Sequence, residues 1–296
     1  MMKKIVLIDA YAQIYRSFYA VRGLTNPRGE MVNALYGVGR LLLNLERSLP
    51  SSYGAVVFDK GKPARRVELC PEYKAQRPPM PDDLRGQLPA IREWLAAFGW
   101  PILEQDGAEA DDIIAAVAGV REGLPVAILT HDKDIAQLVS PEVELLQSVK
   151  GDAWESVGPA EVEAKFGVPV ACLGDYLCLL GDSSDNIRGV DGVGPKTAAK
   201  LLQDYGSIDG ILAHLDDISN ERLRGKLQAA GDLLARNREL VRLDAALPDG
   251  WTGLDGIRRR TPDWVRIKTL AEAEGFKSML TSISEKQQKG QQLSLF

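Results

Sequence analysis

Nine carboxylates, eight of them at predicted strand ends or helix starts, form a set that could hold metal ions. Short apolar runs end at Asp9 ("KIVLID"), Asp59 ("GAVVFD") and Asp132 ("VAILTHD"). Clustered carboxylates raise one another's pKa values, and bound cations remove that penalty. The complete set comprises Asp9, Asp59, Glu109, Asp111, Asp112, Asp132, Asp134, Asp182 and Asp185.

The donor type in this set indicates which ion would bind and what it would do. Oxygen ligands without His or Cys select the hard ions Mg²⁺ or Mn²⁺ over zinc. The two histidines, His131 and His214, are too few and too far apart in the sequence for a zinc site. Two hard ions about 4 Å apart are the usual apparatus for hydrolysing phosphodiesters. The pattern therefore predicts metal-dependent phosphodiester hydrolysis.

A second motif, "GDSSDNIRGVDGVGPKTAAKLL", joins carboxylates to a glycine-rich turn and the start of a helix. Small residues at a helix N-terminus let backbone N–H groups approach a phosphate. Asp182 and Asp185 would repel that phosphate unless a cation lay between them. The motif therefore predicts a metal-bound phosphate beside a turn that contains Gly192, Gly194 and Lys196.

One motif of this kind also has a simpler interpretation. In "DGAEADDIIAAVAG", Glu109 and Asp112 share a helix face, and acids in a first turn commonly complement the helix dipole. The acids of "THDKD" have the same simpler interpretation, as residues at the start of a helix. Only the combination of all nine acids favours metal binding.

The elements that must position these acids form an α/β pattern. Continuous apolar strands alternating with helical segments predict a mostly parallel sheet that helices cover on both faces. Ligands of such sheets bind at the carboxyl ends of the strands. Residues 60–89 are rich in proline and predict a long, partly helical insertion, and the chain is helical after about residue 160.

Composition limits the class of protein further. The chain has 296 residues, 45% of them hydrophobic, and a net charge of −5, which argues against a general, strongly basic nucleic-acid binder. Basic residues cluster within 60–77 and at 258–260, and a solvated face is the simpler interpretation of either run. The three cysteines lack metal-ligand spacing, and neither a cleaved leader nor a membrane span is expected. These features predict a cytoplasmic protein.

Five motifs in order resemble the 5′-nuclease superfamily, which includes flap endonucleases and the 5′-3′ exonuclease domain of bacterial DNA polymerase I. They are "IDAYAQIYRSFYA", "VFDKGKPARRVELCPEYKAQRPPMPDDL", "GAEADDIIA", "THDKDIAQLV" and "LLGDSSDNIRGVDGVGPKTAAKLL", within residues 3–245. The resemblance implies a stand-alone, monomeric enzyme with a PIN-like core. It implies a catalytic core at 1–165 with a helical arch at 60–89, a helical DNA-binding region at 166–283 with a helix-hairpin-helix near 188–202, and a flexible tail at 284–296.

The resemblance also implies roles for individual residues. Lys74 and Arg77 would contact the scissile phosphate, Tyr73 would stack on a base, and Arg66 would bind DNA. One metal is implied around Asp9, Asp59, Glu109 and Asp111, and the other around Asp132, Asp134, Asp182 and Asp185, with Asp112 adjoining both through water. The hairpin would grip one strand of a duplex through Gly192, Gly194, Lys196 and Thr197. A K⁺ ion is implied on the carbonyls of Leu179, Leu180, Arg188, Val190 and Val193.

Two positions depart from the family pattern, with Arg65 where an aromatic residue is common and Asp191 within the hairpin. The main hypothesis is a two-metal nuclease that cuts 5′ flaps or 5′ ends during replication and repair. A non-catalytic branched-DNA binder is the alternative, and the complete acid set argues against it. An aspartyl phosphatase would need an acid two residues after Asp9, where Tyr11 stands. Exonuclease or flap preference, and DNA or RNA-primer substrate, stay open.

The last five residues, "QLSLF", form a separate candidate motif. A polar stretch, "SEKQQKGQQ", separates their apolar side chains from the preceding helix, which leaves those side chains without an obvious face to join. The segment resembles the pentapeptide by which bacterial repair proteins bind the sliding clamp. A tail that folds back onto its own core is the alternative. The clamp-binding residues would be Gln292, Leu293, Ser294, Leu295 and Phe296.

Overall fold

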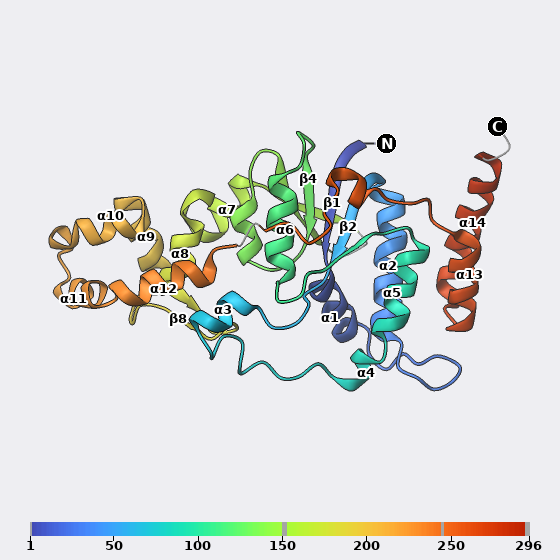
Figure 1. Cartoon of the computed structure of the whole chain (residues 1–296), viewed down its shortest axis with the longest axis horizontal. Helices are drawn as coiled ribbons and strands as arrows, with labels where there is room; N and C mark the ends of the chain where they lie inside the picture. Colours follow the sequence, from blue (N-terminus) through green and yellow to red (C-terminus); the bar gives the residue numbers. More distant parts are fainter. Residues whose placement is uncertain (1, 150–152, 244–245, 294–296) are drawn as a thin grey trace.

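A six-stranded sheet forms the centre of the molecule in this computed structural model, which describes residues 2–149, 153–243 and 246–293 (Figure 1). The strand order is β3-β2-β1-β4-β5-β6, with β6 antiparallel to β5 and the other pairs parallel. The sheet confirms the predicted α/β class. The strands are β1 (Met2–Asp9), β2 (Ser51–Val57), β3 (Ile102–Leu103), β4 (Val126–Leu129), β5 (Val143–Ser148) and β6 (Trp154–Val157).

Helices cover both faces of the sheet. Side chains alternate between the two faces along each strand, so an apolar strand contributes to a hydrophobic core on each face. Ile5 and Leu7 of β1 belong to one hydrophobic core, together with α6 (Ala110–Gly119). Val6 and Ile8 belong to the other. That second core includes side chains of α1 (Ala10–Ala20), α2 (Asn33–Ser48) and α5 (Leu88–Ala97).

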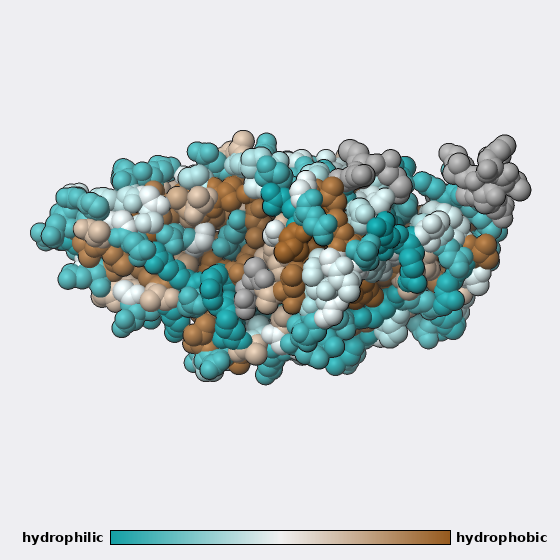
Figure 2. All heavy atoms as spheres, turned by 45° about the horizontal axis from the view of Figure 1, so that its top comes forward, coloured by the Kyte–Doolittle hydropathy of each residue, from teal (hydrophilic) through white to brown (hydrophobic). Residues whose placement is uncertain are grey.

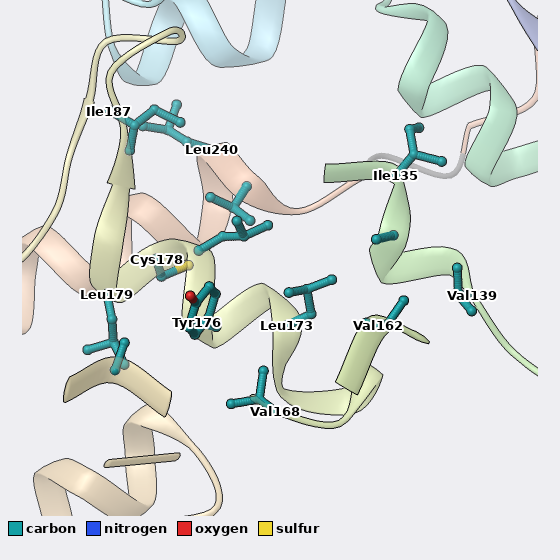
Figure 3. Close-up of a cluster of buried hydrophobic side chains, with 14 of the residues drawn as sticks. Ile135, Val139, Val162, Val168, Leu173, Tyr176, Cys178, Leu179, Ile187 and Leu240 are labelled. Atoms are coloured by element: carbon teal, nitrogen blue, oxygen red, sulfur yellow. The ribbon is translucent and has the colours of Figure 1, made fainter. Parts of the chain in front are cut away.

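A helical region extends from the α6 face of the sheet and lies at the left of Figure 1. Figure 3 shows how Ile135 and Val139, which follow β4, share a cluster with Leu173, Tyr176 and Leu240 of this region. The first hydrophobic core is therefore continuous from the sheet into the helices. The region contains α7 (Pro159–Phe166), α8 (Leu173–Leu180), β7 (Gly181–Asp182), β8 (Ile187–Arg188), α9 (Pro195–Tyr205), α10 (Ile208–Ala213), α11 (Glu221–Ala229) and α12 (Gly231–Val241).

The last two helices differ from the expected boundaries. We expected residues 166–283 to form one DNA-binding region, but α13 (Trp264–Ala273) and α14 (Lys277–Leu293) return to the α2 and α5 side of the sheet (Figure 1). Phe276, Met279 and Ile283 are buried in the second core. The stretch after Ser284 is helical as far as Leu293 rather than a flexible tail, because its Gln, Glu and Lys residues are good helix formers.

The proline-rich insertion forms only two short helices, α3 (Ala64–Leu69) and α4 (Asp82–Arg85). Between them, residues 70–81 form turns and extended chain, because prolines at 71, 78, 79 and 81 interrupt any helix. We call residues 60–89 the arch segment. It runs along the lower edge of Figure 1 from the helical region toward α4. Its middle contacts the turn between β7 and β8, where Lys74 N donates to Asp185 O at 3.0 Å.

Hydrophilic residues cover most of the face drawn in Figure 2, and apolar residues show in smaller patches between them. The large hydrophobic residues with the greatest exposure are scattered along the chain, which is ordinary for protein surfaces. They are Tyr19, Leu69, Val120, Val149, Leu247 and Val265. Across the described ranges, none of the helices has both the length and the apolar character that a bilayer crossing requires.

Candidate metal centre and nucleic-acid interface

Four of the predicted ligands form a first acidic group at the carboxyl edge of the sheet. Asp9 ends β1, and its carboxylate accepts hydrogen bonds from Ala12 N at 3.1 Å and Thr130 Oγ1 at 2.8 Å. Asp59 follows β2 and accepts from the Ala110 amide at 3.0 Å. Because β2, β1 and β4 are adjacent, their carboxyl ends bring the acids together. The group comprises Asp9, Asp59, Asp111 and Asp132.

The first group carries more negative charge than its surroundings neutralise. Burial is the main cause that raises the pKa of Asp9 to about 7, and Asp59 and Asp132 add to the effect. Burial also raises the pKa of Asp111 well above its usual value, with further contributions from Asp132, Asp9 and Asp59. These carboxyls interact strongly enough to need protons or cations between them.

The second acidic group consists of Asp134, Asp182 and Asp185, each of which offers one oxygen within 4.8 Å of the other two. Asp134 Oδ1 is buried, and it has no hydrogen-bond partner among the described residues. Burial, followed by the charge of Asp132, raises the pKa of Asp134 to about 7. A buried oxygen without a partner, in an oxygen-only donor set, fits a hard divalent cation. The charge of Asp132 raises the pKa of Asp111 in the first group and that of Asp134 in the second, so Asp132 interacts with members of both groups.

Lys133 contacts the second group, and the sequence reasoning missed it. Its ammonium lies 2.8 Å from Asp182 Oδ2. Burial would raise the pKa of Asp182, but bonds from Lys133 and Ser184 outweigh burial and lower it. The sequence contains one indication of this contact, because Lys133 lies inside "THDKD" between two predicted metal ligands.

Two cations of the arch segment, Lys74 and Arg77, lie against the acids. The Lys74 ammonium donates to Glu109 and lies 3.6 Å from Asp185 Oδ2. Arg77 Nη2 lies 2.5 Å from Asp185 Oδ1. Lys74 adopts a left-handed backbone conformation, with φ of 54°, which turns the chain here. Contact between these cations and a phosphate stays a prediction.

Tyr73 does not have the exposed position that stacking on a base requires. Only 7% of the residue is exposed. Its hydroxyl lies 3.1 Å from Glu109 Oε2 and 3.0 Å from Asp185 Oδ2. Burial and these two acids raise the pKa of Tyr73. In this structure the arch segment packs its aromatic residue inward against the acids, and stacking on a base stays a prediction.

Arg66 and Asp112 pair with each other inside the protein. Arg66 is 4% exposed and Asp112 is 6% exposed. The Arg66 Nη atoms lie 2.5 Å and 2.8 Å from the two Asp112 oxygens, so the pair is bidentate. Arg66 is thus buried rather than exposed to solvent, and both oxygens of Asp112 face Arg66. Asp111 and Asp112 point to different sides of α6, because successive helical residues differ by about 100°.

The hairpin residues lie between β8 and the start of α9. Gly192 is exposed with φ of 78°, and Gly194 caps α9. Lys196 is exposed in the first turn of the helix, and Thr197 is half-buried. The arrangement leaves the N-terminus of α9 accessible, as phosphate binding requires. Contact with a duplex stays a prediction.

Three of the five carbonyls expected to bind K⁺ already accept hydrogen bonds. Leu179 O accepts from Val190 N at 2.8 Å, and Val190 O accepts from Val193 N at 3.0 Å. Arg188 O accepts from Asn237 Nδ2 at 2.8 Å. A carbonyl has two lone pairs, so these bonds leave room for a cation. The K⁺ site, including the carbonyl of Leu180, stays a prediction.

The proposed clamp peptide falls at the end of the described chain. Gln292 and Leu293 are the last residues of α14. Ser294, Leu295 and Phe296 lie outside the described residues.

Together, the parallel sheet, the two acidic groups at its carboxyl edge and the neighbouring cations define a metal-dependent phosphodiesterase. Comparison with known proteins supports this class. Residues 4–167 match the 5′-3′ exonuclease N-terminal resolvase-like domain, and residues 168–264 match the 5′-3′ exonuclease C-terminal SAM fold. The chain therefore belongs to the 5′-3′ exonuclease family, and it is a metal-dependent nuclease.

Relatives of known function agree with this assignment. The chain is 35% identical over 297 residues to the 5′-3′ exonuclease of Aquifex aeolicus, with full coverage of both chains. It is 38% identical over 279 residues to the thermostable DNA polymerase I of Thermus thermophilus, and it spans only 32% of that longer protein.

Two solved structures share the fold at low sequence identity. A bacteriophage T5 flap endonuclease complex with DNA and metal ions has a TM-score of 0.69 at 21% identity, over 96% of this chain and 97% of that one. The catalytic core of Rad2 with DNA substrate has a TM-score of 0.62 at 17% identity, over 92% and 88%.

Proposed function

We propose that this nuclease hydrolyses DNA phosphodiesters at 5′ flaps and 5′ ends with two Mg²⁺ or Mn²⁺ ions. One observation carries the proposal: Lys74 and Arg77 of the arch segment both lie within 4 Å of Asp185, a member of the second acidic group. This juxtaposition brings phosphate-binding cations to a site whose carboxylates fit metal ions.

The two acidic groups are the proposed metal sites. Asp9, Asp59 and Asp111 of the first group, together with Glu109, would hold one ion, and the second group, together with Asp132, would hold the other. When bound, the ions would supply a hydroxide nucleophile and neutralise charge on the reacting phosphate. The raised pKa values of Asp9 and Asp134 support the assignment, because each site gives up bound protons when a cation arrives.

The residues of the chain itself position the substrate. Lys74 and Arg77 would exchange their contacts with Glu109 and Asp185 for contacts with the scissile phosphate, where their charge stabilises the charge that develops. The Tyr73 hydroxyl lies within hydrogen-bond distance of Glu109 and Asp185, so its single proton can be donated to either carboxylate. Lys133 holds Asp182 and limits how far that carboxylate turns.

The hairpin at the start of α9 is the proposed duplex contact. Amides near Gly192 and Gly194, together with Lys196, would bind one phosphate backbone, and K⁺ on the nearby carbonyls would add a further positive charge. The C-terminal peptide would bind a bacterial sliding clamp and tether the enzyme to replication and repair sites. We propose a monomer that acts in the cytoplasm.

Cleavage of end-labelled 5′-flap and nicked duplexes in Mg²⁺ tests the function, and Asp132→Ala is the matched inactive variant. Wild type should cut within a few nucleotides of the junction, and Asp132→Ala should bind the flap without cutting it. Absence of cleavage by wild type in both Mg²⁺ and Mn²⁺ would reject the proposal.

A further inference from the structure

Arg66 uses all five of its N–H donors inside the protein. Its Nε donates to Leu240 O at 2.9 Å. One terminal nitrogen donates to Glu109 at 2.6 Å and Asp112 at 2.5 Å. The other donates to Asp112 at 2.8 Å and to the carbonyl of Arg242 at 3.0 Å. A buried guanidinium with every donor engaged is held in one orientation, and so are its partners.

The carbonyl partners of Arg66 belong to the C-terminal end of α12, where helical carbonyls lack partners within the helix. Arg65 contacts the same end, with Nη1 2.6 Å from Glu239 O and Nη2 2.8 Å from Arg242 O. The two adjacent arginines of α3 therefore cap α12. Asn237 of α12 in turn donates to the carbonyl of Arg188, just before the hairpin. The arch segment is thus tied to the helix that supports the hairpin.

The acidic partners of Arg66 lie at the start of α6. Arg66 takes both oxygens of Asp112 and one oxygen of Glu109, whereas the other Glu109 oxygen accepts from Lys74. Asp112 is therefore already neutralised by an arginine. One oxygen of Glu109 therefore accepts from Arg66, and the other accepts from Lys74 of the arch segment.

We propose that Arg66 is a positioning residue of the nuclease: it keeps Asp112 out of the metal-ligand set, orients Glu109, and joins both acids to α12 and the hairpin. This inference rests on the proposed two-metal function. It assigns the second arginine of "ARR" to the acid site rather than to DNA, and it explains why a buried cation lies beside predicted metal ligands.

Lysine cannot replace Arg66 in this position. Its single ammonium carries three donors and lacks the planar fork that binds both Asp112 oxygens while also reaching Glu109 and the α12 carbonyls. In Arg66→Lys, Glu109 should lose its fixed orientation. Loss of such an outer contact typically weakens metal binding or activity by about 10-fold to 100-fold.

The test measures Mn²⁺ binding by calorimetry and flap cleavage for wild type, Arg66→Lys and a matched control, Arg259→Lys. Arg259 is also a buried arginine, paired with Glu46 and lying 3.8 Å over the ring of Trp100, in the other core. Arg66→Lys should weaken Mn²⁺ binding about tenfold or more and lower kcat, after correction for the folded fraction. Arg259→Lys should change stability alone. Identical Mn²⁺ affinity and kcat in the two variants would overturn the proposal.

A second comparison stays informative if Arg66→Lys fails to fold. Asp111 and Asp112 are adjacent acids, and only Asp111 is assigned to a metal. Asp111→Asn should weaken Mn²⁺ binding at least tenfold, whereas Asp112→Asn, which keeps one acceptor for Arg66, should change it less than about threefold. Equal losses in the two variants would show that Asp112 is a ligand and refute the assignment of Arg66. Failure of wild type to cleave DNA would instead refute the proposed function, because the Mn²⁺ measurements do not depend on cleavage.

Discussion

The ammonium of Lys226, from α11, lies 2.6 Å from Asp191 at the turn of the hairpin. The Lys226 Nζ also lies 2.9 Å from the point that a side chain on Gly192 would occupy, so it borders the backbone proposed to bind phosphate. The bond to Lys226 and the charges of Lys226, Arg188 and Arg222 lower the pKa of Asp191. The acid that departs from the family pattern is therefore neutralised within the protein.

Asp191→Asn should tighten duplex binding and steepen its salt dependence, because it frees the charge of Lys226 beside the hairpin. Lys226→Ala should weaken binding and reduce the slope by about one unit. The exposed pair Lys200 and Asp204 on α9, 3.0 Å apart, supplies a matched control in Asp204→Asn. Fluorescence anisotropy across a salt series measures all three, and equal effects of the two Asp→Asn changes would contradict a specific role for Asp191.

The strand ends could be predicted from the sequence, whereas contacts between distant segments could not. Asp9, Asp59 and Asp132 each follow an apolar run, and in a parallel sheet such positions meet at one edge. The pairing of Arg66 with the end of α12 joins residues 174 positions apart. No local pattern near Arg66 indicates where α12 ends. The family resemblance therefore implies a DNA contact for Arg66, and the sequence alone gives no sign of its partners on α12.

Burial of Tyr73 and the return of the last helices follow from packing in the same way. An aromatic residue in a proline-rich insertion has no periodicity that would distinguish an exposed ring from an inward one. Met279 and Ile283, one turn apart, form an apolar stripe that needs a core to cover it, but the sequence does not say which core. The α2 and α5 side of the sheet supplies it.

Asp134→Asn should stabilise the metal-free protein while it removes metal-dependent stabilisation. The Asp134 oxygen without a partner is ionised at high pH, and an asparagine amide can donate to the neighbouring carboxylates instead. We expect the free energy of unfolding at pH 8 in EDTA to rise by about 1 to 3 kcal/mol. Urea unfolding with and without Mg²⁺ measures both effects. A decrease in EDTA would indicate that Asp134 has a stabilising partner in the folded protein.

Lys74→Ala and Lys196→Ala should have opposite kinetic profiles. Lys74 contacts Glu109 beside the acids, so its loss should lower kcat about 100-fold or more with little change in KM. Lys196 lies in the first turn of α9, so its loss should weaken duplex binding and leave single-turnover cleavage of saturated enzyme nearly unchanged. Indistinguishable profiles would argue against separate roles for the arch segment and the hairpin.

Deletion of residues 292–296 should abolish binding to a bacterial sliding clamp without changing cleavage of short flaps. The deletion removes Gln292 and Leu293, the last described residues of α14, and the peptide after them, and it leaves both acidic groups and the arch segment intact. Calorimetry with purified clamp measures the first effect, and flap cleavage without clamp measures the second. A matched variant, Leu295→Ala with Phe296→Ala, tests the apolar side chains alone. Undiminished clamp affinity after the deletion would rule the peptide out.

The contribution of Asp9 and Asp134 to the stability of the metal-free protein should fall as the pH rises from about 4 to about 7. Asp9 and Asp134 have folded pKa values of about 7, raised chiefly by burial from the usual 3.8. A raised pKa means that the folded state binds protons more tightly than the unfolded state, so the stabilising contribution of these two groups is fully present below about pH 4 and is lost as the pH rises through about 7. Mg²⁺ should reverse the loss, and its affinity should rise over the same range, because binding displaces those protons.

Urea unfolding at several pH values in EDTA and in Mg²⁺ tests this pH dependence. Subtracting the Asp134→Asn curve from the wild-type curve removes the contributions of titrating groups that do not interact with Asp134. The difference should grow between pH 4 and pH 7 in EDTA and should change sign when Mg²⁺ is present, because only wild type keeps the complete second acidic group. A difference that is independent of pH in EDTA would show that Asp134 titrates normally and would remove the electrostatic argument for a cation at this position.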